Sequence, residues 1–439
     1  MSRFITITLT VLLLFTGSAF GSEIREFFLP NGLKIVIVEN HKAPVVTFQI
    51  WYKVGSRNEV TGKTGISHLL EHMMFKGTPK YGKGEYSSIV ARNGGNENAF
   101  TSQDYTAYFQ NISSDRFETA LDLESDRMIN LLIDPSEFML ERDVVKEERR
   151  LRTEDDPVSS LIEELYAAAF KIHPYRSPVI GWMNDLNNLT REDIYNYYKE
   201  YYRPDNATIV VVGDIKSEEI VEKIGHYFGV LPKSTPPVRE VKITETEQKG
   251  ERRFLYKREA QLPYVIYGYH APNYKDKDHY ALDLLSKILS GGKSSRLYQN
   301  LVYSKQIALA AGGGFTSVQS DPELFYFYAQ LKPGRTTEEA EAALNEEIER
   351  IKREPVSERE LQKARNQTEA SFIMGQDSVF YQAMLIGQLE TTGAGGRYLE
   401  SYIDEIRRIT PEDIMRVAQK YFVEDSRTVG VLVPLTNKQ

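Results

Sequence analysis

Cysteine is absent from this chain of 439 residues, which excludes disulfide bonds, thiolate metal sites and thiol nucleophiles. A bound metal ion must therefore be held by histidine, aspartate or glutamate, and histidine itself is scarce, with 7 residues. An excess of basic charge is also absent, because 54 Lys and Arg against 62 Asp and Glu give a net charge of -8. This balance gives no indication of nucleic-acid binding.

Long apolar runs are missing beyond the N-terminus, where no stretch reaches the 18 or more residues that a membrane span needs. The N-terminus has Arg3, an apolar run over residues 5–15 and small residues up to Gly21. This pattern predicts a secretory signal peptide at residues 1–21 and an exported protein, most simply a periplasmic one. Secretion, or anchoring by an uncleaved N-terminal segment, is the alternative. Without cysteine, a bacterial lipid anchor is excluded.

The remaining composition, 41% apolar and 26% charged residues, is that of a globular protein with room for two or three domains. Residues 27–29, 33–38 and 46–54 have the alternation of antiparallel strands around a Pro-Asn-Gly turn. Helical patterns follow at residues 65–76, 114–132, 135–153, 158–170 and 190–202. Strands followed by helices predict an α+β fold.

An internal repeat defines the predicted domain organisation. Thr190-Arg-Glu-Asp-Ile, followed by Tyr201-Tyr202 and an apolar run, recurs as Thr410-Pro-Glu-Asp-Ile, followed by Tyr421-Phe422 and an apolar run, with an offset of 220 residues. In both copies a threonine N-cap with an acidic residue three positions on starts a helix. We predict two homologous domains at residues 22–235 and 251–439, with a linker at 236–250, each an antiparallel-rich sheet packed with helices.

Residues 68–72 read His-Leu-Leu-Glu-His, so the two histidines lie one helical turn apart and their imidazoles can converge on one metal ion. At 100° per residue, His68, Glu71 and His72 share one sector of the helix. The opposite sector is apolar and is expected in the core: Ile66, Leu69, Leu70, Met73 and Met74. The competing interpretation is a pair of structural histidines near a surface glutamate.

A third ligand is expected on the helix that Asp134 caps, with Pro135 in its first turn. On this helix an apolar stripe is predicted, with Glu141 and Glu148 projecting from its middle and Glu147 at its edge. The stripe consists of Leu140, Val144, Val145 and Leu151. Two carboxylates on a buried face require a partner. The alternative is that this charge run is a solvated face.

The His-Leu-Leu-Glu-His motif, with Glu148 lying 76 residues after His72, resembles the pitrilysin/insulinase family of inverted-motif zinc peptidases. The similarity spans the mature chain and is nearest to the small two-domain branch of processing-peptidase-like proteins. It implies that His68, His72 and Glu148 bind one zinc ion per chain, that Glu71 is the general base, and that Glu141 orients a ligand histidine. In this branch each chain forms half of a clamshell shell.

The segment Asn98-Ala99-Phe100-Thr101 resembles the family's substrate-binding edge strand, to which an extended peptide adds as a further strand. All four residues are therefore candidate substrate-binding residues. An ordinary strand after the Gly94-Gly95 turn is the alternative.

The chain departs from the family in its C-terminal half. Self-sufficient members have an Arg and a Tyr seven positions apart that stabilise the oxyanion, and the aligned residues here are Val302 and Leu309. Neither side chain donates a hydrogen bond. Arg296 and Tyr298 lie nearby with the wrong spacing, and we expect them to be structural. In the family such a gap is filled by a homologous subunit that has the Arg/Tyr pair.

These observations predict a periplasmic zinc endopeptidase for unfolded peptides, acting as the metal-bearing subunit of a heterodimer with an Arg/Tyr-bearing homologue. A self-sufficient homodimeric peptidase is the rival within the enzyme class. A non-catalytic shell or scaffold subunit that keeps zinc for stability is the alternative outside it. A metal-delivery protein would need a mobile His/Asp-rich loop, which the sequence does not contain.

Overall fold

The computed structural model describes residues 23–235, 238 and 241–435. The predicted signal peptide at residues 1–21 lies outside this range. None of the helices within the described residues is both long enough and apolar enough to cross a bilayer.

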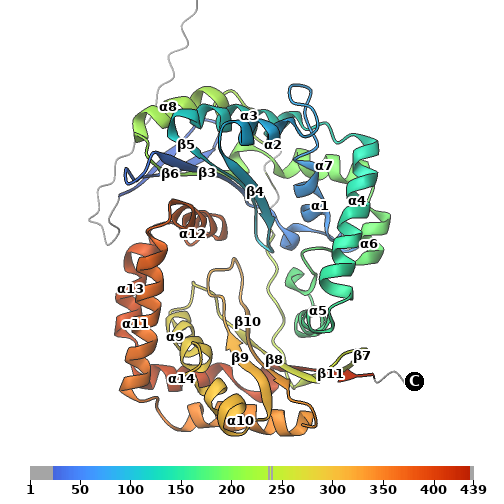
Figure 1. Cartoon of the computed structure of the whole chain (residues 1–439), viewed down its shortest axis with the longest axis vertical. Helices are drawn as coiled ribbons and strands as arrows, with labels where there is room; N and C mark the ends of the chain where they lie inside the picture. Colours follow the sequence, from blue (N-terminus) through green and yellow to red (C-terminus); the bar gives the residue numbers. More distant parts are fainter. Residues whose placement is uncertain (1–22, 236–237, 239–240, 436–439) are drawn as a thin grey trace, which may run out of the picture.

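Two sheets organise the chain, and in each all neighbouring strands but one pair run antiparallel (Figure 1). The first has the spatial order β1 (Ile24–Phe28), β2 (Lys34–Glu39), β6 (Ala207–Gly213), β3 (Val45–Tyr52), β5 (Thr106–Ser113) and β4 (Asn96–Thr101). The second has the order β7 (Arg252–Arg258), β11 (Arg427–Pro434), β8 (Tyr264–Ala271), β10 (Glu323–Leu331) and β9 (Ala308–Gly314). The parallel pairs are β2–β6 and β7–β11. The predicted α+β class is therefore confirmed.

The helices occur in two comparable series. The first half contains α1 (Ile66–Met73), α2 (Glu85–Arg92), α3 (Phe117–Asn130), α4 (Pro135–Arg149), α5 (Pro157–Ala169), α6 (Met183–Asn188), α7 (Arg191–Tyr201) and α8 (Ser217–Phe228). The second half contains α9 (Asp278–Ser290), α10 (Thr337–Arg353), α11 (Glu358–Gly375), α12 (Val379–Thr392), α13 (Tyr398–Arg408) and α14 (Pro411–Tyr421).

The sequence repeat corresponds to the pairs α7–β6 and α14–β11. Thr190 and Thr410 are N-caps, and each forms a capping box with the aspartate three residues later. Each helix leads into the strand that lies second or third in its sheet, beside the parallel partner. Apart from β1, the two sheets have equivalent strand orders, so both copies fold alike.

Each half contributes one helix to the sheet of the other half. Helix α12 packs on β3 and β6, whereas α5 packs on β11 and β8, as Figure 1 shows. Consequently both faces of the first sheet are buried: Ile35 and Ile37 belong to one core and Val36 and Val38 to the other. The predicted boundaries, 22–235, 236–250 and 251–439, stay a prediction, and this exchange shows that neither half is packed independently of the other.

Helix α12 lies very close to the first sheet. A Cβ atom added to Gly387 would lie 2.0 Å from a ring atom of Trp51, so only glycine permits this approach. The contact holds the second half against the first sheet, whose far edge is β4. On its other face the same sheet carries α1, the helix with the two histidines.

Candidate metal and catalytic site

Helix α1 is fixed at its N-terminus by a partly buried carboxylate. Glu59 accepts hydrogen bonds from the backbone N–H groups of Gly65 (2.8 Å) and Ser67 (2.9 Å), which supplies acceptors to otherwise unpaired donors of the first turn. Gly65 is left-handed, with φ of 83°, and an added Cβ would lie 2.5 Å from the Ile180 carbonyl oxygen. Burial raises the pKa of Glu59 to about 8.

The rotation of α1 follows from its apolar sector, which confirms the predicted division of its faces. All five residues of that sector are buried: Ile66, Leu69, Leu70, Met73 and Met74. His68, Glu71 and His72 consequently project from the side that faces α4, with which α1 packs.

Helix α4 begins as predicted, because the Asp134 side chain accepts hydrogen bonds from the N–H groups of Ser136 and Glu137, and Pro135 occupies the first turn. The predicted stripe is wrong in three of its four members. Only Val145 is buried, whereas three are exposed: Leu140 (57%), Val144 (48%) and Leu151 (71%). The face that packs is instead Phe138, Glu141, Val145 and Arg149.

The buried face of α4 therefore lies on a different side of the helix from the predicted one, and its acidic residues have different surroundings. Glu141 is buried within the packed face, and Glu148 retains 16% exposure at the edge of that face. Glu147, by contrast, projects outward and pairs with Arg150. The charge run is therefore only partly a solvated face, and its two site residues lie where α4 meets α1.

The ligand atoms of His68, His72 and Glu148 all lie within 4.8 Å of one another. Glu148 Oε2 is 3.7 Å from His68 Nε2 and 3.5 Å from His72 Nε2. Ligands about 2.0–2.2 Å from a tetrahedral zinc ion are roughly 3.3–3.6 Å apart, so the two distances from Glu148 to the imidazoles are close to those around one such ion. Among the described residues, these three form the one group of His, Asp and Glu side chains whose ligand atoms lie close enough together to hold a metal ion.

Two further features fit a cation between these residues. Glu148 Oε2 is buried and accepts no hydrogen bond from the described residues, which is costly for a carboxylate oxygen unless a positive charge is beside it. Burial lowers the pKa of His68 to about 3, so this imidazole is neutral, the form that ligates metals.

Helical neighbours orient the ligand side chains. Glu141 Oε2 lies 3.2 Å from His72 Nδ1, which leaves Nε2 of that ring toward Glu148. Lys76 Nζ lies 2.5 Å from the other oxygen of Glu141, and the Arg152 guanidinium lies 2.6 Å from Glu148 Oε1. Lys76 and Arg152 were not predicted from the sequence, although Arg152 lies four residues after Glu148, the spacing of helical side-chain pairs.

Glu71 is held by a residue from the predicted edge strand. The Thr101 hydroxyl donates a 2.5 Å hydrogen bond to Glu71 Oε2. Burial raises the pKa of Glu71, whereas the Thr101 hydrogen bond and the neighbouring His72 charge lower it. A carboxylate of raised pKa beside two histidines is suited to take up and return a proton.

Strand β4, which contains the four candidate substrate-binding residues, lies at the edge of the first sheet, as predicted. Its side chains alternate between the two faces. Ala99 packs on the core beneath α1, and Thr101 reaches Glu71 from that same face. Phe100 points the other way and packs on Trp51, with ring centroids 5.3 Å apart, while Asn98 is exposed.

The residues aligned with the family's Arg/Tyr pair lie in the second half. Val302 is partly buried against the second core, and Leu309 is 48% exposed on β9. Arg296 donates two hydrogen bonds to the Glu360 carboxylate, at 2.8 and 3.0 Å. The guanidinium is thus engaged in an ion pair with Glu360 of α11, which agrees with the structural role expected for it.

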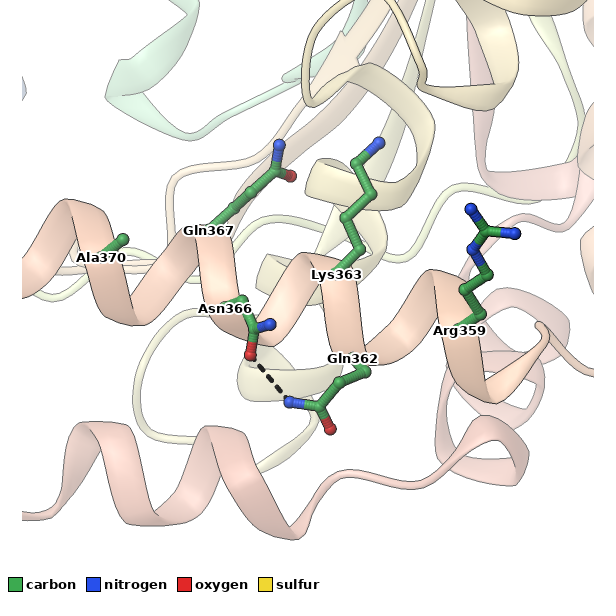
Figure 2. Close-up of a pocket in the computed structure, with 6 residues that line it drawn as sticks. All are labelled: Arg359, Gln362, Lys363, Asn366, Gln367 and Ala370. Atoms are coloured by element: carbon green, nitrogen blue, oxygen red, sulfur yellow. Dashed lines mark hydrogen bonds between the residues drawn. The ribbon is translucent and has the colours of Figure 1, made fainter.

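Helix α11 is the counterpart of α4 in the second half. Counted from the N-caps Asp134 and Ser357, Glu141 and Glu148 correspond to Ala364 and Ser371, which are not zinc ligands. An open hollow of about 510 Å³ on α11 is lined by five polar or basic residues and one alanine, all drawn in Figure 2: Arg359, Gln362, Lys363, Asn366, Gln367 and Ala370. This hollow contains none of the residues around His68.

In comparisons with protein families, two parts of the chain match two different family models. Residues 34–182 match the family described as "Insulinase (Peptidase family M16)", and residues 188–368 match the "Peptidase M16 inactive domain". The zinc protease PqqE of Helicobacter pylori is 36% identical over 410 residues, covering 92% of each chain.

Solved structures show the same relationship. A protease from Helicobacter pylori has a TM-score of 0.91 and 35% identity, covering 94% of this chain and 100% of that one. The first half of the periplasmic protease PqqL from Escherichia coli has the same fold, with a TM-score of 0.77 and 18% identity over 95% of this chain and 94% of that one. Against the PqqL protein as a whole, the match covers 50% of its chain.

Proposed function

Because the chain belongs to the insulinase family, peptidase family M16, we propose that it is a zinc-dependent endopeptidase acting on unfolded peptides or small protein segments. The observation that carries the proposal is the convergence of His68, His72 and Glu148 with Glu71 beside them. Homologues named as zinc proteases support the choice of metal.

In this proposal His68, His72 and Glu148 hold one zinc ion per chain. Bound zinc would act as a Lewis acid on a peptide carbonyl and lower the pKa of a coordinated water. Glu71 accepts the proton of the attacking water and returns it to the leaving amine. Glu141 accepts the Nδ1–H of His72, which fixes the tautomer and the ring orientation.

The free edge of β4 is the proposed peptide-binding surface, with Asn98, Ala99, Phe100 and Thr101 at its end. An extended peptide that pairs with this edge gains backbone hydrogen bonds whatever its sequence. A folded protein cannot offer such an extended segment, and unfolded chains are therefore the expected substrate class.

We place the protein in the periplasm on the pattern of its N-terminal 21 residues, a basic start, an apolar run and small residues. The structural likeness to a protease described as periplasmic is compatible with this compartment.

A second chain is proposed to complete the oxyanion site. Val302 and Leu309 cannot donate hydrogen bonds, and Arg296 is engaged by Glu360. The match to half of the PqqL chain supports an arrangement of two such halves around one chamber. We therefore propose a heterodimer with an Arg/Tyr-bearing homologue, in which this chain is the metal-bearing half of the clamshell.

The partner proposal predicts weak activity for the isolated chain. Adding a homologous chain that has the Arg/Tyr pair and no zinc motif is expected to raise kcat/KM at least about a hundredfold, the scale of one lost oxyanion donor. The measurement is cleavage of a quenched, unstructured peptide by each chain alone and by both, with association followed by sedimentation.

The control is the same homologue with its Arg replaced by Ala, which should associate without raising the rate. Full activity of this chain as a monomer or homodimer would contradict the partner proposal and favour the self-sufficient peptidase. A stable zinc-loaded complex without any hydrolysis would instead favour a scaffold subunit.

A further inference from the structure

Thr101 connects the edge strand to the residue proposed as the general base. It is the last residue of β4, and its hydroxyl lies 2.5 Å from Glu71 Oε2 on α1. The strand and the helix also pack on each other. Because β4 pairs with β5 through Thr101 and Thr106, the hydroxyl is held at a defined position on the sheet.

This contact controls a side-chain torsion that is otherwise loosely defined. The terminal torsion of a glutamate is broad, with no strongly preferred rotamer. Among the described residues, Thr101 is the side-chain donor that reaches Glu71. With Oε2 engaged by the hydroxyl, Oε1 remains available to exchange a proton.

The neighbouring carboxylates follow the same pattern. Glu148 has Oε1 beside Arg152 and Oε2 toward the two histidines. Glu141 has one oxygen beside Lys76 and the other beside His72. In each case one oxygen is engaged by a donor, and the other is directed to the group with which the carboxylate acts.

We infer that Thr101 is a positioning residue: its hydroxyl orients the Glu71 carboxylate, and its place at the end of β4 links the peptide-binding edge to the base. The inference rests on the proposed function. It gives the Thr101 side chain a role distinct from backbone pairing with the substrate, since that side chain faces α1. Seating a peptide along β4 then stiffens the same strand that holds Glu71 in place.

The test compares Thr101→Val, which keeps the shape and removes the donor, with Thr101→Ser, which keeps the donor. In zinc-loaded protein, with an unstructured peptide, Thr101→Val is expected to lower kcat by about 10- to 100-fold, as for a misoriented catalytic group. KM should stay within about twofold, because backbone pairing at β4 is unaffected. Thr101→Ser should restore most of kcat.

The matched control is Thr106→Val, the same change on the residue opposite Thr101, whose hydroxyl bonds the Val54 carbonyl rather than Glu71. Its kcat should stay close to that of the unmodified protein. Unchanged kcat in Thr101→Val, equal losses in the Val and Ser variants, or a rise in KM alone would overturn the inference.

A structural readout separates this inference from the proposed function. Crystal structures of the zinc-loaded protein and of Thr101→Val should show Glu71 in one orientation in the first and in several in the second. If the unmodified protein lacked the Thr101–Glu71 hydrogen bond, the positioning role would be wrong whether or not peptides are cleaved. If the bond were present but neither the chain alone nor its complex with the Arg/Tyr-bearing homologue hydrolysed peptide, the proposed function would fail instead.

Discussion

Replacing Glu71 with glutamine is expected to lower kcat for peptide hydrolysis by about 10²- to 10⁴-fold, the usual contribution of a general base. Glutamine has nearly the same shape, and its amide oxygen can still accept the Thr101 hydroxyl. The fold and the zinc content should therefore be unchanged, since Glu71 is not a proposed ligand. The measurements are single-turnover cleavage of a quenched peptide and zinc per chain by mass spectrometry.

The pairing of these two measurements makes the result specific. Loss of zinc together with activity would indicate that Glu71 supports the metal rather than the proton transfer. Turnover at the unmodified rate would refute its assignment as the base.

Replacing Glu148 with glutamine is expected to weaken zinc binding by at least about a hundredfold, more than is usual for residues that only support a ligand. The change removes the anionic oxygen that lies 3.5 and 3.7 Å from the two imidazoles. Glu147→Gln is the matched control, because that neighbouring carboxylate projects outward and pairs with Arg150. Zinc retention during titration with a competing chelator gives both affinities.

Comparing these two neighbouring residues of α4 shows whether Glu148 is a zinc ligand. Equal zinc affinities in the two variants would refute Glu148 as a ligand. A large loss confined to Glu147→Gln would require a different arrangement of α4 against α1.

The helix α1 was predictable from sequence because its two faces differ chemically. Five apolar residues leave one orientation that buries them all, and the two histidines with Glu71 then occupy the opposite side. The repeat was equally predictable, since Thr190 and Thr410 are local capping signals whose hydrogen bonds lie within four residues. Such features depend on few residues that are close in the chain.

The face of α4 was not predictable in the same way. The sequence offers apolar residues on two sides, and periodicity favours the side with Leu140, Val144 and Leu151. The tertiary contact with α1 instead buries Phe138 and Val145, with polar groups between them that find partners on α1. Burial of a carboxylate is acceptable only because His72 and Lys76 lie opposite it, and that information is not local.

The other features that were not predicted from the sequence depend on long-range contacts. Thr101 is 30 residues from Glu71, and no pattern within β4 indicates that its hydroxyl reaches α1. The packing of α5 and α12 on the sheet of the opposite half also has no local sequence pattern. The one local indication is Gly387, a glycine within an apolar helix, which allows the close packing on Trp51. These contacts form only when separate segments meet in the folded chain.

The central claim, a zinc-dependent peptidase site built by this chain, is tested most directly by metal removal and return. The measurement is the cleavage rate of an unstructured peptide by the protein, alone and with the proposed Arg/Tyr-bearing homologue, as purified, after chelation and dialysis, and after addition of one equivalent of zinc. The account predicts about one zinc per chain at the start, loss of cleavage on chelation and its recovery with zinc, with no recovery in Glu71→Gln. Cleavage that persists without metal, or purified protein that holds no zinc, would contradict it.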